Sequence, residues 1–322
     1  MALWRTWIRQ PQALGLRKAI FQIHLWTGLV LGLYVVVMCL SGSVLVYRNE
    51  LYSAFSPKPV FVEPRPVLLS PEQLEAAARR AFAGSEVTQV WRGALPNQAV
   101  ELELTQKNTT SRRLFDPYTG EDLGHAVPAG FRATAWLLDF HDNLLGGETG
   151  RRTNGVGAAL VILSAVTGLV VWWPGVQRWR RSAIVDWRAN WKQFNWGLHS
   201  ALGIWFVVFV LMWGVTGLYL SYPAPFNAAV EYLLPFDPSS EMEGLGDRVL
   251  FWLGYAHFGR FGGRLPGCGR GGVCNEIFKG GWAVVGLVPV AMAATGGIMW
   301  WNRVGATLVR GTRKPQGGEA TP

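Results

Sequence analysis

The chain has 322 residues, of which half are hydrophobic and only 16% carry a charge. Soluble globular domains carry about 25% charged residues, so this composition excludes a disordered chain and disfavours a soluble domain. Its 17 Trp residues favour a membrane protein, because Trp is enriched where a bilayer meets water. The three Cys residues are too few for a disulfide scaffold or a four-cysteine zinc site.

Four apolar segments without Asp, Glu, Lys or Arg predict transmembrane helices, which need about 20 residues each. They are Phe21–Tyr47, Val156–Trp173, Leu198–Tyr222 and Trp282–Trp301. The first is about twice as long as the apolar core of a signal peptide, so we expect it to remain in the protein as a span. The sequence therefore predicts an all-α membrane protein with four transmembrane helices, set in a lipid bilayer.

The basic residues indicate how these helices are oriented. The segments before the first span, between the second and third, and after the fourth hold 13 basic and 2 acidic residues, whereas the other two connections hold 17 and 19. Because positively charged connections stay in the cytoplasm, we expect both termini there and a multi-pass protein of the bacterial inner membrane. Since the basic residues flank spans, we expect no nucleic-acid binding. The predicted division is 1–47, 48–153, 154–174, 175–196, 197–222, 223–280, 281–302 and 303–322.

The first outer connection, residues 48–153, is long enough to form a small domain. A helix is predicted over residues 71–80, with Ser70 as its N-cap and Pro71 at its first position. Val87–Trp91 and the alternating Val100–Leu104 are strand-like, and Asp116–Gly120 has the residues of a turn. We expect a small α+β insertion with antiparallel strands.

The second outer connection, residues 223–280, is rich in Pro and Gly and contains Cys268 and Cys274. Both cysteines are expected on the oxidising side of the membrane, where a disulfide between them can form. The glycine-rich run from Gly267 to Gly272 follows no strand and opens no evident helix, so it does not predict a dinucleotide site.

An internal repeat relates the first two spans to the last two. One constant shift along the chain places His24 on His199, Gly28 on Gly203 and Gly42 on Gly217. A second constant shift places Thr167-Gly168 on Thr295-Gly296 and Trp172-Trp173 on Trp300-Trp301. One further histidine precedes each of these spans: His141 precedes the second and His257 the fourth. Two spans restore the direction of the chain, so the sequence predicts two parallel two-helix repeats.

Four of the five histidines thus form two pairs, which we interpret as ligands because an ionisable residue within a span is costly. His24 and His199 are expected near the cytoplasmic face, and His141 and His257 near the outer face. Two imidazoles with no Cys, Asp or Glu at their depth suit the axial positions of a haem, whereas zinc needs four ligands. Copper stays open, since imidazole suits it too. Each pair predicts one haem b, with the four histidines as iron ligands and Gly28 and Gly203 leaving room for the porphyrin.

Other residues around these pairs have weaker predicted roles. Arg residues near either face could pair with haem propionates, whereas His125 has no partner in the repeat and is interpreted as a surface residue. The chain offers no nicotinamide or flavin site, so electrons must come from a cytoplasmic donor protein or from quinol. The propionate candidates are Arg17 and Lys18 inside and Arg132, Arg151, Arg152 and Arg260 outside.

At these residues the chain resembles the PepSY-associated transmembrane family, some members of which are siderophore-iron reductases of the bacterial inner membrane. The resemblance implies a periplasmic PepSY-like domain in the first outer connection, two b-type haems on the four matching histidines, and reduction of iron in a periplasmic ferric siderophore. The residues that carry it are 23–28, Ser41-Gly42, 115–121, Phe140-His141-Asp142, 196–199, the Thr-Gly of the second and fourth spans, and His257.

Positive charge on the outer side could attract an anionic iron chelate, although solvated surface or haem-propionate partners explain the same residues equally well. Two other functions stay open: a quinol-linked haem subunit serving another periplasmic redox partner, and a non-redox protein whose PepSY-like domain binds a peptide or protein. The substrate candidates are Arg112, Arg113, Arg260, Arg264 and Arg270.

Overall fold

The computed structural model describes residues 2–107, 109–235, 244–259, 261, 268 and 272–305. The chain forms two compact units, which we describe separately. The membrane unit comprises Met1–Val46 and Leu138–Pro322, and the strand unit comprises Tyr47–Leu137.

Four long apolar helical segments of the membrane unit make the chain a multi-pass membrane protein, as predicted. The fourth segment, Val273–Val304, contains α11 (Val273–Gly286), α12 (Val288–Trp300) and a π-helical turn (Trp301–Gly305). It is divided at Leu287, just before Pro289, because proline lacks the N–H that would continue the helical hydrogen bonds. The other three segments are α2 (Gly15–Leu45), α6 (Gly147–Trp172) and α8 (Trp191–Ser221).

These helices begin before the apolar segments that predict them. The Asn190 side chain accepts a hydrogen bond from the Gln193 N–H and so starts α8 well ahead of Leu198. Helix α6 likewise starts at Gly147 with a polar first turn. Hydropathy therefore locates the apolar part of each span, and not the first residue of its helix.

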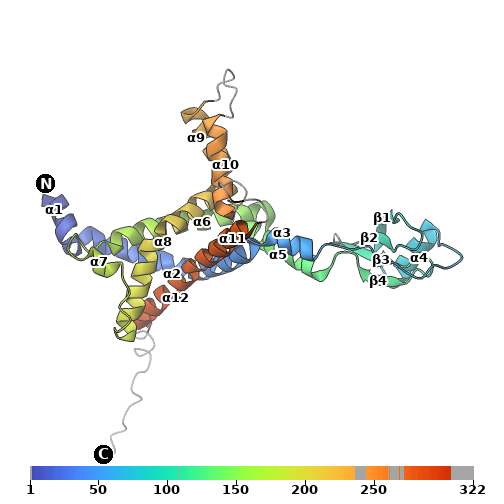
Figure 1. The fold of residues 1–322 in the computed structure, drawn as a ribbon, viewed down its shortest axis with the longest axis horizontal. Coiled ribbons are helices and arrows are strands. Elements are labelled where there is room, and N and C mark those ends of the chain that lie inside the picture. Colours follow the sequence, from blue (N-terminus) through green and yellow to red (C-terminus); the bar gives the residue numbers. More distant parts are fainter. Residues whose placement is uncertain are drawn as a thin grey trace, which may run out of the picture. The chain divides into compact units, whose positions relative to one another are not determined.

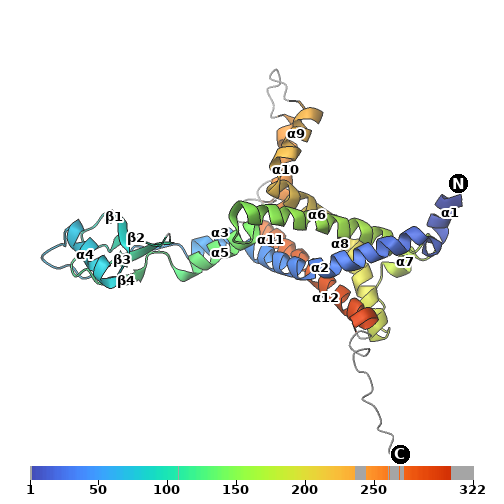
Figure 2. The same ribbon diagram turned by 180° about the vertical axis from the view of Figure 1, so that it is seen from behind.

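The long helices pack in the cyclic order α2, α6, α8, α12, each in contact with its two neighbours. Figure 1 and Figure 2 show them side by side as one bundle. The repeat units are therefore α2 with α6 and α8 with α12, and α2 and α8 lie diagonally across the bundle.

Shorter helices complete the membrane unit. Helix α10 (Leu245–Phe258) and helix α5 (Ala129–Asn143), of which only the part from Leu138 belongs to this unit, each carry one of the predicted histidines in the last turn. Helix α10 ends at Gly259, which has the positive φ of 64° that glycine tolerates. The others are α1 (Ala2–Arg9), the 3₁₀ helix Pro11–Ala13, α7 (Trp179–Ser182) and α9 (Pro223–Leu233).

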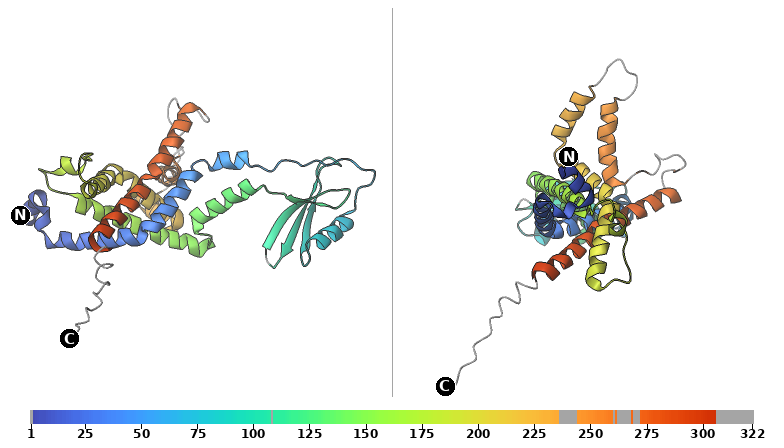
Figure 3. Two further views of the ribbon diagram at one scale, coloured as in Figure 1. Left: turned by 90° about the horizontal axis from the view of Figure 1, so that it is seen from below. Right: turned by 90° about the vertical axis from the view of Figure 1, so that its left-hand side faces the viewer.

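The strand unit is a four-stranded antiparallel sheet in the order β1-β2-β3-β4, with α4 against it (Figure 3). In the register, Leu102 of β2 lies opposite Val90 of β1 and Arg113 of β3. The core joins Leu74 and Ala78 of α4 to residues of β2 and β3. The elements are α3 (Arg48–Ala54), α4 (Pro71–Ala81), β1 (Glu86–Trp91), β2 (Val100–Gln106), β3 (Thr109–Phe115) and β4 (Asp122–His125).

Local sequence signals of the strand unit are confirmed. Ser70 and Gln73 form a reciprocal capping box at the start of α4. The Asp116 carboxylate accepts hydrogen bonds from the N–H groups of Tyr118 and Thr119 at 2.7 and 3.2 Å, and Gly120 takes a φ of 71°. These contacts build the predicted turn between β3 and β4.

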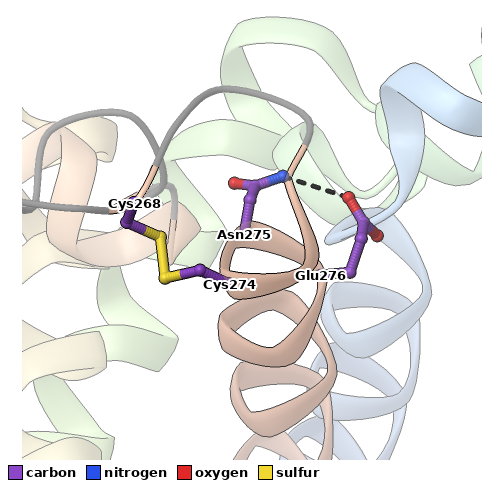
Figure 4. The surroundings of a disulfide bond; sticks show 4 residues. All are labelled: Cys268, Cys274, Asn275 and Glu276. Atoms are coloured by element: carbon purple, nitrogen blue, oxygen red, sulfur yellow. Dashed lines mark hydrogen bonds between the residues drawn. A yellow bond between two sulfur atoms is a disulfide. The ribbon is translucent and has the colours of Figure 1, made fainter.

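The predicted disulfide is also confirmed. Cys268 and Cys274 are bonded, with 5.5 Å between their Cα atoms (Figure 4). Cys274 lies in the first turn of α11, where Figure 4 also shows the side chain of Asn275 donating a hydrogen bond to Glu276. The bond therefore ties the connection after α10 to the start of the fourth span.

Candidate functional site: two histidine pairs in the helix bundle

The first histidine pair joins the two diagonal helices of the bundle. His24 of α2 and His199 of α8 have ring centroids 6.4 Å apart, with 66° between the ring planes. The two residues occupy equivalent positions of the internal repeat, so the twofold relation of the repeats brings them together. The structure thus unites a pair that sequence symmetry predicts.

The second histidine pair comes from the two shorter helices. His141 of α5 and His257 of α10 have ring centroids 6.3 Å apart, with 56° between the ring planes. Unlike the first pair, these residues lie outside the four spans and pack against α2 and α8 near the C-terminal ends of those helices. The two pairs thus share one ring separation although different elements carry them.

Hydrogen bonds at Nδ1 define the tautomer of the first pair. His24 Nδ1 lies 3.0 Å from the carbonyl oxygen of Ser164, and His199 Nδ1 lies 3.1 Å from that of Met292. A carbonyl oxygen can only accept, so both Nδ1 atoms carry the proton. The Thr167 and Thr295 hydroxyls lie 3.5 and 2.9 Å from the same nitrogens. In a neutral imidazole this leaves the Nε2 lone pair for a ligand.

The second pair is held by hydroxyl groups. His141 Nδ1 lies 2.9 Å from Ser41 Oγ, and His257 Nδ1 lies 2.9 Å from Thr216 Oγ1. Both hydroxyls donate to carbonyl groups of their own helices, at 2.8 and 2.7 Å, so they accept from the imidazoles. Burial lowers the pKa of both histidines, which keeps the rings neutral.

A glycine lies against each imidazole. A Cβ atom built on Gly42 would lie 2.9 Å from His141 Cε1, and one on Gly168 would lie 3.0 Å from His24 Cε1. The corresponding distances are 3.3 Å from Gly296 to His199 and 3.8 Å from Gly217 to His257. Each of these glycines follows the Ser or Thr that bonds the same ring. A Ser/Thr-Gly pair therefore contacts each of the four histidines.

Gly28 and Gly203, predicted to leave room for a porphyrin, do not lie against the imidazoles. A Cβ on Gly28 would meet no atom within 4 Å, and one on Gly203 would meet only Met292 Cε at 3.7 Å. Neither contacts an imidazole, so any room they provide lies beside the pair. The four hydroxyls escaped the sequence prediction, although Ser41-Gly42, Thr167-Gly168, Thr216-Gly217 and Thr295-Gly296 recur at repeat positions and could have identified them.

The donor set fits a haem iron. Among the described residues no three His, Cys, Asp or Glu side chains gather at one point, so each level offers two imidazoles. Metal–nitrogen bonds of about 2 Å, plus about 1 Å from each nitrogen to its ring centre, would place two trans imidazole centroids about 6 Å apart. The observed separations of 6.4 and 6.3 Å match this value. Metal-ligating histidines also commonly bond an oxygen through the other ring nitrogen, as the Nδ1 atoms of these four histidines do.

The model of the PepSY-associated TM region family matches residues 21–242. The chain belongs to this family. The match confirms the resemblance seen in the sequence and includes His24, His141 and His199. It ends before His257 and the Cys268–Cys274 disulfide, so the repeat and the geometry alone connect His257 to the site. No curated protein sequence matches the chain.

In this family member, the arginines predicted to meet haem propionates lie in varied surroundings. Arg17 donates through Nη2 to the Val171 carbonyl, while its buried Nε has no partner in the described part of the chain. Arg151 and Arg152 both pair with Glu148. Lys18 is exposed, and Arg132 lies in α5. Arg260 lies outside the described residues.

The substrate candidates of the strand unit are already paired. Arg112 lies 3.4 Å from the Glu101 carboxylate, 3.2 Å from that of Glu103, and stacks on Trp91 at 4.6 Å. Arg113 pairs with Asp122. Burial raises the pKa of Asp122, but hydrogen bonds from Arg113 and the Gly124 N–H outweigh this, and the pKa is lowered.

Three further substrate candidates, Arg260, Arg264 and Arg270, lie outside the described residues. His125 is exposed at the end of β4, as predicted, with its Nε2 3.5 Å from Arg113 Nη1. The charges of β3 thus serve ion pairs within the sheet, and an anion would have to compete with the carboxylates for them.

An open apolar groove with a volume of about 540 Å³ lies between α8 and α10. Its wall includes Thr216, whose hydroxyl holds His257, and among the described residues that line it Arg248 alone is charged. This volume suits a small organic ligand. The remaining lining is apolar: Met212, Val215, Leu245, Val249, Trp252, Leu253 and Ala256.

Proposed function

We propose that the chain is a di-haem transmembrane oxidoreductase of the bacterial inner membrane that reduces iron in periplasmic ferric siderophores. The observation that carries the proposal is the repetition of one geometry. Two imidazole pairs lie at repeat-related positions, 6.4 and 6.3 Å apart, and every Nδ1 is bonded to an oxygen. Four chance histidines would not share these features.

The depths of the two pairs suit a path across the membrane. His24 and Gly42, which contacts His141, are both in α2 and 18 residues apart. A helix rises about 1.5 Å per residue, so about 27 Å separates the two levels, close to the roughly 30 Å thickness of a bilayer core. The excess of basic residues in the connections supports an orientation with the first pair near the cytoplasm and the second near the periplasm.

The chain's own residues hold and orient the ligands. His24 with His199, and His141 with His257, would each hold one iron through Nε2. The Ser and Thr hydroxyls keep the proton on Nδ1, and the adjacent glycines let each ring approach its helix closely. Each bound haem b would supply reversible one-electron exchange between its ferric and ferrous states. A separate cytoplasmic protein or a membrane quinol provides the electrons.

The chemistry of the substrate accounts for the reaction. One electron converts ferric iron of the chelate to ferrous iron, which hard oxygen ligands bind more weakly, so the metal is released. No bond to carbon is made or broken, and the chain needs no nucleophile or general base for this step. The strand unit is expected on the periplasmic side, where it could meet the siderophore.

The test mixes dithionite-reduced protein, freed of excess reductant, with a ferric trihydroxamate chelate in the presence of a ferrous-iron trap. We expect one reduced haem to be oxidised for each ferrous ion trapped. The His257→Ala variant serves as the control, because it retains the first pair but should react far more slowly. Reduced haems that persist for minutes in the presence of the chelate would contradict siderophore reduction.

The groove between α8 and α10 favours one second candidate, a quinol-linked haem subunit for another periplasmic redox partner. Its apolar wall and the Arg248 guanidinium suit a quinone ring, and it adjoins the residue that holds His257. Reduction of the haems by a short-chain ubiquinol, weakened by Arg248→Leu and without any reaction with ferric chelates, would favour this function over the first.

A further inference from the structure

A buried asparagine clamps the end of the helix that carries His141. Asn154 of α6 is 6% exposed, and its Nδ2 donates to the carbonyl oxygens of His141 at 2.7 Å and Asp142 at 3.0 Å. Its Oδ1 accepts a hydrogen bond from the Tyr34 hydroxyl of α2 at 3.1 Å. Asn154 thus connects α5 to two spans.

The second repeat contains a clamp at the equivalent position. The shift that aligns the second and fourth spans, Thr167 onto Thr295, also places Asn154 on Trp282 of α11. Trp282 Nε1 donates to the carbonyl oxygen of His257 at 3.4 Å. Its indole lies directly over Gly259, where a Cβ would come within 2.2 Å of the ring. Both repeats therefore aim a side-chain N–H at the backbone carbonyl of the second-pair histidine.

The supports of the two clamps are equivalent as well. The shift that aligns the first and third spans places Tyr34 on Phe209, whose ring packs on Trp282 with centroids 5.8 Å apart. Met38 falls likewise on Trp213, which packs on the same indole at 5.5 Å. One repeat thus supports its clamp through a hydrogen bond and the other through aromatic packing.

The positions of the two histidines explain why a clamp is needed. Helix α5 ends at Asn143 and α10 at Phe258, so His141 and His257 lie in last turns, whose carbonyls lack partners within the helix. Such ends fray unless other groups bond the free carbonyls. An imidazole on a fraying turn could not keep a constant distance from its partner.

We propose that Asn154 and Trp282 are equivalent positioning residues, each of which fixes the imidazole of the second pair by bonding the backbone carbonyl of its histidine. The proposal rests on the proposed function only in taking that pair to hold a haem. Both side chains bond the ligand's backbone rather than its ring, so both act through the position of the last helical turn.

The longer connection of the second repeat is consistent with its bulkier clamp. His141 and Asn154 are 13 residues apart, whereas His257 and Trp282 are 25 residues apart. The disulfide from Cys268 to Cys274 lies within the longer connection and ties it to α11 (Figure 4). In the second repeat, the packed indole of Trp282 and the disulfide thus take the place of the short connection between His141 and Asn154 in the first repeat.

The test compares Asn154→Leu and Trp282→Phe with Trp172→Phe in the full-length, haem-loaded protein. Leu removes both amide donors at similar volume, and Phe keeps an aromatic ring at position 282 while removing its N–H. Trp172→Phe is the matched control, because it removes an indole N–H that bonds the Ser182 carbonyl at 3.2 Å, far from the second pair. The readouts are haem content, the electron paramagnetic resonance of each ferric haem, and the midpoint potentials.

For Trp282→Phe we expect two haems per chain, with a shifted resonance and potential for one haem and wild-type values for the other. For Asn154→Leu we expect a larger shift of the same haem or its loss, so that haem content falls from two towards one. Trp172→Phe should leave the second-pair signals unchanged. A role in packing alone predicts wild-type signals for Trp282→Phe, and that result would overturn the proposal.

Hydrogen exchange separates this proposal from the proposed function. Backbone amides near the ends of α5 and α10 should exchange faster in Asn154→Leu and Trp282→Phe, respectively, whether or not haem is present. Wild-type protein that binds no haem, together with these faster rates in the variants, would refute the proposed function and leave the clamps standing. Unchanged rates with two bound haems would refute the clamps alone.

Discussion

The first and second histidine pairs have nearly the same ring separation but are built differently. His24 and His199 lie within spans, and their Nδ1 atoms reach backbone carbonyls as well as hydroxyls. His141 and His257 lie in the last turns of short helices, and each is held by a hydroxyl and by a clamp on the backbone; His141 also has a backbone hydrogen bond to Met38, whereas His257 has none among the described residues. Backbone carbonyls support both rings of the first pair, whereas His257 of the second pair depends on side chains.

This difference shows where a substitution should matter. A carbonyl acceptor cannot be removed by changing a side chain, so the first pair keeps part of its support under most substitutions. By contrast, a single substitution can remove a side-chain hydroxyl, a glycine or a side-chain amide. We therefore expect the second pair to be the more sensitive of the two, and the following predictions test that asymmetry.

The largest effect is expected from removing a ligand. His24→Ala should lose the haem of the first pair and retain the other, and His257→Ala should do the reverse, because each iron loses one of its two axial ligands. Haem per chain, measured by the pyridine haemochrome method, should fall from two to one in each variant. Two haems retained in both would show that these histidines are not ligands.

The next effect contrasts two equivalent glycines. Gly42→Ala would bring a Cβ within 2.9 Å of His141 Cε1, so the ring must move, whereas Gly217→Ala would bring one only to 3.8 Å from His257 Cε1. We expect a displaced resonance of the second-pair haem in the first variant and wild-type resonance in the second. Equal effects of the two substitutions would contradict the difference in distance between each glycine and its imidazole.

A smaller effect is expected from the hydroxyls. Thr216→Val removes the acceptor of His257 Nδ1, and leaving a buried donor unpaired costs about 1–3 kcal/mol. Thr295→Val leaves His199 Nδ1 with the Met292 carbonyl at 3.1 Å and should cost much less. Haem affinity, from competition with an apo-haem protein, should therefore drop about tenfold or more in Thr216→Val only. A larger loss in Thr295→Val would reverse the asymmetry.

The smallest effect is expected outside the membrane unit. Because Arg112 already pairs with Glu101 and Glu103, Arg112→Gln should change the KM for a ferric chelate less than about fivefold, the factor that corresponds to an exposed ion pair of about 1 kcal/mol. The initial rate of ferrous-iron trapping at several chelate concentrations measures this. A tenfold rise in KM would instead show that Arg112 binds the chelate.

Much of the membrane unit could be predicted from the sequence, because apolar length and repeat symmetry are direct consequences of the bilayer. The first shift of the internal repeat pairs His24 with His199, and the places of His141 and His257 ahead of the aligned second and fourth spans pair the other two. The helix starts could not be predicted from hydropathy, since each helix begins before its apolar segment; a polar cap, Asn190, marks the start of α8. The division at Leu287 follows from Pro289, a signal present in the sequence but outweighed by the apolar run.

The contacts that hold the histidines were harder to predict. A hydroxyl or an indole is assigned a role only when the side chain it reaches is known, and His141 and Ser41 are 100 residues apart in the chain. Asn154 and Trp282 are equivalent only in that each side chain donates an N–H. Because the two residue types are otherwise dissimilar, a comparison of residue types does not reveal this equivalence. In the strand unit, local rules predicted α4 and the turn at Asp116, whereas the pairing of Arg112 with Glu101 and Glu103 required the sheet register.

The most direct test of the account is the absorption spectrum of the purified, folded protein, oxidised and dithionite-reduced, with haem quantified per chain. We predict two low-spin haems per chain with the bands of bis-imidazole ligation, one for each histidine pair. Folded protein that binds no haem, or only one, would contradict the claim that both pairs hold iron.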